Sequence, residues 1–356
     1  MLRAYWKPLS VAAAVALIAL IAVIVTWGGD DGSSPAASDL PTSTTTIPGD
    51  SGDQSPEATA PPEPVSRNPL TGAPLDTPSD QQVIAVRVGN GDAERPQAGL
   101  GEAGLIYETL LEGGETRFIA LYFGEEPDSV GPVRSIRPVD AAIVAPFAPL
   151  FAFSGGQDFV YRLVQAAGVA VIDETDVAAL TRSDGVAPHN LFLDYTTALT
   201  RAIGGPPRVA PLPFSGDWQP AGESADQVSF RFGSRAIEYV FDTGGGYLRS
   251  QDGIPFEVLG PDDLETLTRD TVVIQFVAQR SAGYSDVAGA EVPDFDVVGF
   301  GEALVFHEGE AVAVEWRRAS QASGTLFFDA EGEPFALPSG QLIIELVPIG
   351  TEVTFG

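Results

Sequence analysis

The arginines between positions 117 and 137 are the most suggestive chemistry-bearing side chains in this sequence. Arg134 and Arg137 stand directly before Pro138, where a helix is expected to begin, and Arg117 follows a glycine-rich turn. Helix N-termini favour anions because their backbone N–H groups are unpaired and the helix dipole is positive there. Guanidinium groups bind carboxylates and phosphates through two parallel hydrogen bonds. We therefore expect a site for an anionic ligand, unless neighbouring acidic residues simply pair with these arginines.

Two further segments could complete such a site. Ser154-Gly155-Gly156 separates an apolar strand from a helix, so its backbone N–H groups could bind an anion, although a tight turn with Ser154 as the helix cap is the simpler explanation. His189 and Asn190 lie in a loop that reads Ala-Pro-His-Asn-Leu-Phe. This imidazole could act as a general base or as a ligand group, or it could bind only backbone carbonyls.

A pair of glutamates offers a different chemistry. Glu108 and Glu112 both occupy even positions, so they share one face if their strand is continuous. Two carboxylates on one face could act as an acid–base pair, and His189 could assist them. The alternatives are one exposed face of a hairpin or an ion pair with Arg117. The sequence shows no nucleophile or oxyanion site beside them, so whether the protein is an enzyme stays open.

Composition excludes several classes of function. The chain has 356 residues, with 49 acidic and 19 basic side chains and a net charge of -30, which argues against nucleic-acid binding. It contains no cysteine, so disulfides, thiol nucleophiles and lipid attachment through cysteine are excluded. With two histidines, a multi-histidine metal centre is not expected. We expect neither a metal nor a cofactor.

The N-terminal segment is typical of a membrane anchor. Residues 9–27 are apolar except for Ser10 and Thr26, and as a helix they would measure about 28 Å, close to the thickness of a bilayer core. Arg3 and Lys7 precede this run, which predicts a cytoplasmic segment 1–8, a transmembrane helix 9–27 and an extracytoplasmic remainder. Cleavage as a signal peptide is the alternative. Residues 28–66 are rich in Gly, Ser, Thr, Pro and acids, so we expect a disordered extracytoplasmic linker.

Residues 67–205 alternate between strand and helix patterns. Apolar runs at 83–88, 105–111 and 118–123 predict strands, and the last two should form a hairpin through the glycines at 113–114. Helices are expected at 138–147, 158–167 and 194–203, with further strands at 150–153 and 169–172. This alternation predicts an α+β domain with an α/β-like sandwich.

The second half is dominated by strand patterns. Residues 206–225 have little periodicity and are expected to link two domains. Residues 226–356 contain short β-rich runs separated by glycine turns, including 271–277, 303–307, 311–316 and 342–347. This spacing predicts a mainly-β C-terminal domain, either a barrel or a sandwich.

Several long motifs resemble a known family. Asn68-Pro-Leu-Thr-Gly72, RPQAGLGEAGLIYETLLEGGETRFIALYF at 95–123, GPVRSIRP at 131–138, APHNLF at 187–192 and the stretch 316–348 are similar to the YerB-like family of bacterial lipoproteins. The resemblance covers both folded halves, roughly 67–356, and implies two domains of unknown function on the outer face of the membrane. Family members of the lipoprotein type carry a cysteine for lipidation, which this chain lacks.

These observations predict a single-pass protein of the cell membrane whose folded halves are extracytoplasmic. We expect an envelope ligand-binding or assembly module with an arginine-lined pocket for an anionic envelope ligand, built from Arg117, Arg134, Arg137, Ser154, Gly155, Gly156, His189 and Asn190. One alternative is a hydrolase of envelope polymers that uses Glu108 or Glu112 with His189. Another is a protein–protein scaffold that binds an envelope protein through edge strands of the β half.

Overall fold

The computed structural model describes residues 3–5, 65–79, 81–202, 212–215, 218, 222–260, 263–286 and 288–356. The predicted anchor 9–27 and the linker up to residue 64 lie outside these residues, whereas Val65 and Ser66 belong to β2 (Val65–Arg67). Of the predicted inter-domain linker, the described part includes β13 (Phe214–Ser215) and β14 (Glu223–Ser224). No helix in the described ranges is both long and apolar enough to span a membrane.

In the described part of the chain, one large sheet of 13 strands organises the fold, which is rich in β-structure, as the sequence predicts. In spatial order its main strands are β10 (Ala170–Ile172), β9 (Leu150–Ala152), β4 (Ile84–Gly89), β7 (Thr116–Tyr122), β6 (Leu105–Leu110), β29 (Leu342–Pro348), β22 (Thr271–Ser285), β24 (Gly299–His307), β25 (Glu310–Arg318), β26 (Leu326–Phe328) and β27 (Pro334–Phe335). In addition, β14 pairs with β25, and β23 (Glu291–Asp296) pairs with β22.

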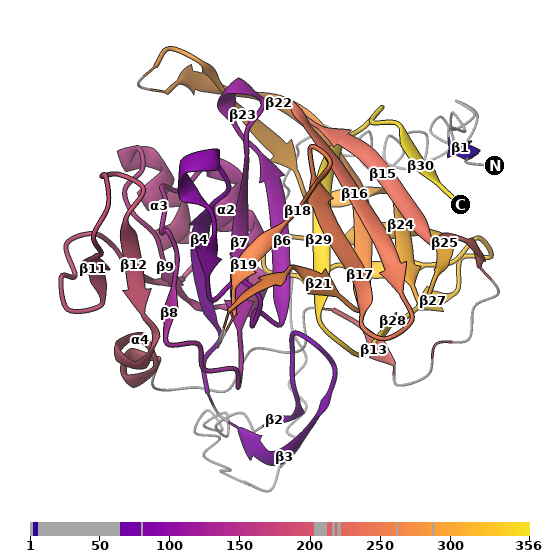
Figure 1. The fold of residues 1–356 in the computed structure, drawn as a ribbon, viewed down its shortest axis with the longest axis horizontal. Helices are drawn as coiled ribbons and strands as arrows, with labels where there is room; N and C mark the ends of the chain where they lie inside the picture. Colours follow the sequence, from indigo (N-terminus) through magenta and orange to yellow (C-terminus); the bar gives the residue numbers. More distant parts are fainter. Residues whose placement is uncertain are drawn as a thin grey trace, which may run out of the picture. The chain divides into compact units, whose positions relative to one another are not determined.

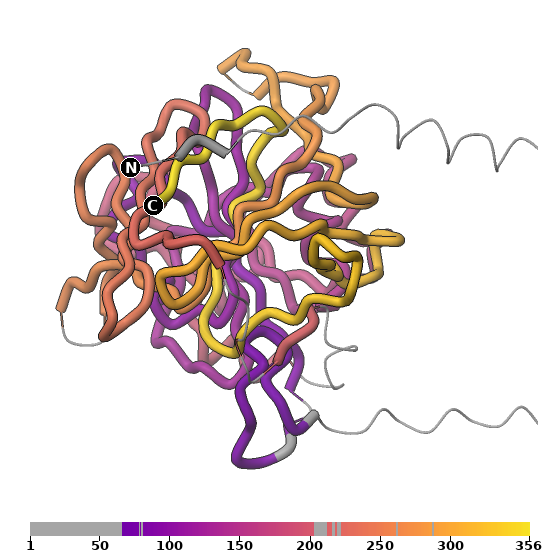
Figure 2. Tube along the Cα trace, turned by 90° about the vertical axis from the view of Figure 1, so that its right-hand side faces the viewer, coloured from indigo at the N-terminus to yellow at the C-terminus, as the bar shows by residue number. Residues whose placement is uncertain are grey.

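The large sheet joins the two halves of the sequence. Strand β6 from the first half pairs in parallel with β29, which lies near the C-terminus, so that Leu105 stands opposite Leu342 and Glu108 opposite Glu345. The purple and yellow traces of Figure 2 accordingly run through one body, and the described residues from 65 onward belong to a single compact unit. The halves are therefore held together by backbone hydrogen bonds as well as by side-chain packing.

A second sheet covers one face of the large one (Figure 1). It contains β1 (Arg3–Tyr5), β30 (Val353–Phe355), β15 (Gln227–Phe232), β16 (Arg235–Asp242), β17 (Gly246–Gln251), β18 (Ile254–Pro255) and β21 (Thr268–Arg269). One apolar core lies between the two sheets and includes Ile106, Phe118, Tyr239, Tyr247 and Ile343. This core combines residues of both halves.

Helices α2 (Pro138–Val144) and α3 (Asp158–Ala166) lie on the opposite face of the large sheet, whereas Tyr195 and Ala198 of α4 (Tyr195–Arg201) belong to the first core. A second apolar core there includes Ile119 and Leu121 of β7 together with Val139 and Ile143 of α2. The described helices are α2 (Pro138–Val144), α3 (Asp158–Ala166), α4 (Tyr195–Arg201) and the short 3-10 turns η1 (Asp92–Glu94), η2 (Glu112–Gly114) and η3 (Ala145–Phe147). Successive residues of β7 thus alternate between the two cores.

Short sheets complete the fold. Their strands are β11 (Leu180–Arg182) with β12 (Leu191–Asp194) and β8 (Ser129–Val130), β13 with β28 (Leu337–Pro338), β20 (Leu264–Thr266) with β19 (Glu257–Leu259) and β5 (Gln97–Ala98), and β2 with β3 (Pro74–Ser79).

The predicted hairpin and helices of the first half are confirmed, with shorter limits. Strands β6 and β7 pair antiparallel around Gly113 and Gly114, which have φ of 73° and 78°. The helix expected at 138–147 ends as α2 at Val144 and continues as the 3-10 turn η3. The helix expected at 194–203 begins at Tyr195, because Asp194 is its N-cap and accepts a hydrogen bond from Thr197 N.

The N-terminal residues differ from their predicted placement. Arg3–Tyr5 form β1 and pair antiparallel with Val353–Phe355 of β30. A segment that pairs with the folded unit must lie on the same side of a membrane as that unit. If the folded halves are extracytoplasmic, residues 1–8 therefore cannot be cytoplasmic while Arg3–Tyr5 pair with β30.

Candidate functional site

Four arginines gather on the helix-covered face of the large sheet. Arg117 lies on β7, on the same face as Ile119 and Leu121. Its backbone is paired with Gly89 on the neighbouring strand β4. Arg87 lies two residues earlier on β4. Arg134 and Arg137 come from the segment that leads into α2, and Arg134 N donates to Arg87 O at 2.8 Å. The three predicted arginines are therefore neighbours, and Arg87 joins them.

Three of these arginines are paired with carboxylates. Arg87 Nε lies 3.0 Å from Asp140 Oδ2 with both side chains fully buried, and Arg134 Nε lies 2.7 Å from Glu94 Oε1. Arg137 binds Glu112 through its Nε and one terminal nitrogen. The simple explanation from the sequence, that acids neutralise the arginines, therefore holds for Arg134 and Arg137. Glu112 was considered as a partner of Arg117 but binds Arg137, and Glu94 was not predicted.

Burial and charge act against each other on these carboxylates. Burial raises the pKa of Asp140 despite the nearby Arg87. For Glu94 burial also opposes ionisation, but the Arg134 charge and the Gly91 N–H outweigh it and hold its pKa below the ordinary value. Glu112 behaves similarly, because its hydrogen bond and charge interaction with Arg137 lower its pKa.

Arg117 differs from its three neighbours. Its side chain is 7% exposed, and within the described residues no carboxylate lies within ion-pair distance of it. Its guanidinium makes a single hydrogen bond there, from one terminal nitrogen to Ser135 O at 2.7 Å, and its Nε is buried without a partner. Burial, followed by the charges of Arg87, Arg137 and Arg134, lowers the pKa of Arg117 to about 9, which leaves it charged at neutral pH.

Two other buried arginines donate more hydrogen bonds than Arg117 does. Arg269 also lacks a carboxylate within ion-pair distance among the described residues, but it donates to three backbone carbonyls, those of Gly101, Thr268 and Leu100. Arg318 likewise donates to three carbonyls. Both side chains bind and fix backbone segments. Arg117 has one such contact, so its hydrogen-bonding capacity is the least used of the three.

His189 also belongs to this cluster. Its Nδ1 lies 3.1 Å from Glu94 Oε1, and about a third of the side chain is exposed. Arg134 donates to Pro188 O at 3.0 Å, which ties the His189 loop to the arginine segment. Asn190 has a different role, because its side chain accepts from Arg182 and donates to two carbonyls of its own loop.

The Ser154-Gly155-Gly156 segment lies beside the cluster, but the donors of Ser154 and Gly155 already bind other protein groups. Ser154 Oγ donates to Val133 O at 3.1 Å, and Gly155 N donates to Glu174 Oε2 at 2.6 Å. The prediction that Ser154 caps a helix is wrong, because α3 begins at Asp158 and its N-cap is Gln157. Gly156 packs closely, since a Cβ there would lie 2.6 Å from Ile136.

The predicted glutamate pair does not form. Strand β6 ends at Leu110, so Glu112 lies in η2 and the condition for a shared face is not met. Glu108 is fully buried and binds Arg249 in the core between the sheets, at 2.8 Å. Glu112 binds Arg137 and His189 binds Glu94, so the three candidate acid–base groups belong to three separate pairs.

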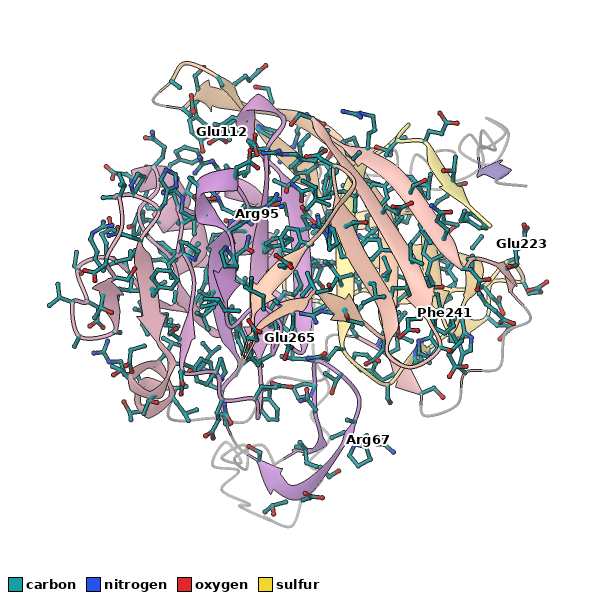
Figure 3. All side chains as sticks on the ribbon, viewed as in Figure 1. Arg67, Arg95, Glu112, Glu223, Phe241 and Glu265 are labelled. Carbon is teal, nitrogen blue, oxygen red and sulfur yellow. The ribbon has the colours of Figure 1, made fainter. Side chains whose placement is uncertain are left out.

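A surface groove lies near the end of the β6–β7 hairpin, where Figure 3 labels Glu112. It has a volume of about 760 Å³ and runs between η2 and the β22–β23 hairpin. Glu112 is the single predicted site residue among those that line it. Within the described ranges, no group of three or more His, Asp or Glu side chains is arranged to hold a metal ion.

Sequence reasoning missed two members of the cluster, namely Arg87 and Glu94. Arg87 is hidden in the apolar strand β4, whereas Asp140 is one of the acidic residues close in sequence to the predicted arginines and therefore a foreseeable partner. The acidic Asp92-Ala-Glu94 turn directly before the family-like Arg95-Pro motif was the available signal for Glu94. The segments 131–137 and 187–190, which carry the resemblance described above, contribute Arg134, Arg137 and His189 to this cluster, and the segment 95–98 contacts the segment 131–137 through the Ala98–Gly131 bridge.

Comparisons with known proteins agree with this architecture. Residues 70–205 match the family described as "Protein of unknown function (DUF3048) N-terminal domain", and residues 228–344 match its C-terminal domain. The chain belongs to this two-domain, YerB-like family, as the sequence motifs indicate.

The sequence and the crystal structure of one relative from Bacillus subtilis illustrate the match. The chain is 27% identical over 294 residues to the protein named "Putative lipoprotein YerB", which covers 79% of this chain and 86% of that protein. The crystal structure of the YerB protein has a similar fold, with a TM-score of 0.67 and 23% identity over 81% of this chain and 99% of the crystallised chain.

Proposed function

We propose that this chain is a membrane-attached protein of the bacterial cell envelope that binds a carboxylate or phosphate group at Arg117. The observation that carries the proposal is a buried guanidinium with no anionic partner within ion-pair distance among the described residues and a single hydrogen bond. Desolvating a charge costs several kcal/mol unless it is paired, so such a residue needs a compensating role.

The charge balance of the cluster supports an anionic ligand. The arginines at 87, 117, 134 and 137 face three carboxylates, those of Asp140, Glu94 and Glu112. The remaining positive charge lies on Arg117, which is the most deeply placed of the three predicted arginines. A carboxylate or phosphate oxygen within hydrogen-bond distance of its Nε would supply the missing acceptor.

His189 and Arg134 are placed to select the rest of the ligand. Both are held by Glu94, and both are partly exposed where Arg117 is buried. In this proposal Arg117 binds the anionic group, while His189 and Arg134 contact the portion of the ligand that stays closer to solvent. In this proposal Ser154 and Gly155 form one side of the anion site, and their hydrogen bonds to Val133 and Glu174 hold them in place.

The envelope assignment rests on the lipoprotein named among the relatives and on the apolar segment 9–27. We propose a single membrane pass through that segment with the folded unit outside, which requires Arg3–Tyr5 to leave β30. Fractionation of cells and protease treatment of protoplasts test this topology. Recovery of the protein in the soluble cytoplasmic fraction would contradict it.

Titration calorimetry with inorganic phosphate and with acetate, on the full chain in detergent at low ionic strength, tests the anion site. Arg117→Met should weaken binding of the preferred anion at least tenfold. Arg231→Met removes the same charge from an exposed position in the other half and should change affinity less than twofold. Equal affinity of the Arg117 variant and the parent protein would refute the site.

A further inference from the structure

A second buried polar cluster lies between the two sheets, on the opposite face of β6 from the arginine site. It contains Glu108 of β6, Glu345 of β29, Arg249 of β17 and Tyr239 of β16. None of these side chains is more than 1% exposed. The cluster therefore joins a strand of the first half to three strands of the second, in surroundings where uncompensated charge is costly.

The two carboxylates of this cluster are direct neighbours. Glu108 and Glu345 are register partners on adjacent parallel strands, and both point into the core between the sheets. Adjacent strands lie about 4.8 Å apart, so the two side chains occupy one small volume. Arg249 is the one cation that pairs with them within the described residues; Arg95 also lies over the Phe256 ring, 4.8 Å from its centroid, and makes no ion pair with either carboxylate.

Hydrogen bonds distinguish the two carboxylates. Both carboxylate oxygens of Glu108 accept hydrogen bonds. Its Oε2 accepts from Arg249 at 2.8 Å, and its Oε1 accepts from Asn90 at 3.1 Å and from Thr116. Glu345 Oε1 accepts from the Tyr239 hydroxyl. Glu345 Oε2 is buried and accepts no hydrogen bond from the described residues. A negative charge on Glu345 would therefore be poorly compensated.

We propose that Glu108 and Glu345 hold one proton between them at neutral pH, and that loss of this proton weakens the junction between the two halves of the protein. The proton resides mainly on Glu345, whose hydroxyl can donate to the Glu108 carboxylate, so that one negative charge faces one guanidinium. When the proton leaves, two adjacent carboxylates share Arg249. Such pairs titrate as a unit, and their repulsion opposes the second ionisation.

The directions in which the pKa values of Glu345 and Tyr239 shift support this arrangement. Burial, and next the charge of Glu108, raise the pKa of Glu345 well above its ordinary value and outweigh Arg249. Burial and the Glu345 charge also raise the pKa of Tyr239, which therefore remains a hydrogen-bond donor. In the unfolded chain Glu345 regains an ordinary pKa. Its contribution to stability is thus full at acidic pH and is lost as the pH rises through the folded-state value.

Urea unfolding of the full chain in detergent between pH 6 and pH 9 tests the proposal. Relative to Glu345→Gln, the parent protein's unfolding constant should increase up to tenfold per pH unit as long as the pH stays below the raised folded-state pKa, since unfolding then releases one proton, and this increase should level off above that pKa. The glutamine amide can accept from Tyr239 and donate to Glu108, so that variant should fold. Glu302→Gln, at an exposed position on β24, should keep the parent's pH dependence. Identical pH dependence in the parent and the Glu345 variant would overturn the proposal.

Carbon-13 NMR of the glutamate side-chain carboxyl groups in the parent protein gives a second readout that needs no variant. One glutamate carboxyl should remain protonated at pH 7 while the exposed glutamates have already titrated. Its resonance should disappear from the spectrum of Glu345→Gln. A spectrum in which every glutamate is ionised at pH 7 would refute the shared proton.

Discussion

Buried ionic clusters lie on both faces of strands β6 and β7, and the buried arginines of the two clusters have different partners. Towards the second sheet, Arg249 binds Glu108 and lies over the rings of Phe118 and Phe256, at 5.6 Å and 4.3 Å from their centroids. Towards α2, Arg117 has one carbonyl contact in the described part of the chain. Burial of a charge is common to both faces, so the difference lies in the partners supplied by the protein.

This difference separates a role in stability from a role in binding. A buried arginine whose hydrogen bonds are satisfied internally holds strands together, and the removal of its partner should strongly destabilise the protein. A buried arginine with few internal partners contributes little to stability and can instead bind a ligand. Variants at the two faces should therefore affect different measurements.

The largest effect is expected at Glu108. Glu108→Gln leaves the Arg249 guanidinium buried without its carboxylate, which should cost ~3–5 kcal/mol of the free energy of unfolding. Urea unfolding monitored by tryptophan fluorescence measures this loss. A cost below about 1 kcal/mol would show that the inter-sheet cluster does not hold the halves together.

A pair of variants on the helix-covered face sharpens the comparison. Arg87→Met leaves Asp140 buried and unpaired, so it should also cost ~3–5 kcal/mol. Arg117→Met removes a charge that has no carboxylate partner within the described ranges, so stability should be unchanged or up to ~2 kcal/mol higher. The same unfolding measurement compares them. If both variants were equally destabilised, Arg117 would be a structural residue like Arg87.

The smallest effect is expected at Glu174. Its carboxylate accepts the Gly155 N–H and is exposed, so Glu174→Ala should cost less than ~1 kcal/mol of stability. The variant frees a backbone donor beside the arginine cluster and removes a negative charge. Phosphate or acetate affinity should therefore be unchanged or modestly higher by calorimetry. A clear loss of affinity would show that Glu174 itself contacts the ligand.

Local elements of this fold could be predicted from the sequence because their signals are local. Gly113 and Gly114 mark the β6–β7 reversal, and Pro138 marks the start of α2. The gathering of Arg117, Arg134 and His189 was also anticipated. Their partners were not, because they depend on which strands become neighbours: Arg249 and Glu108 are 141 positions apart, and His189 and Glu94 are 95 positions apart.

The predicted division into halves was affected by the same limitation. The sequence pattern predicts a helix-containing first half and a strand-rich second half, and α2, α3 and α4 all lie in the first half. This pattern contains no information that β29 pairs with β6, because parallel pairing of distant strands leaves no spacing signal in the sequence. The inter-sheet cluster was missed for this reason, and Glu108 was assigned an acid–base role that its full burial does not favour.

The most direct test of the account observes the Arg117 guanidinium itself. In nitrogen-15 NMR spectra of the full chain, the Nε–H resonance of Arg117, assigned by its loss in Arg117→Met, should shift in a saturable way as phosphate or acetate is added, while that of Arg249 stays fixed. An Arg117 resonance that does not move at anion concentrations that saturate calorimetric binding would contradict the assignment of the anion site to this residue.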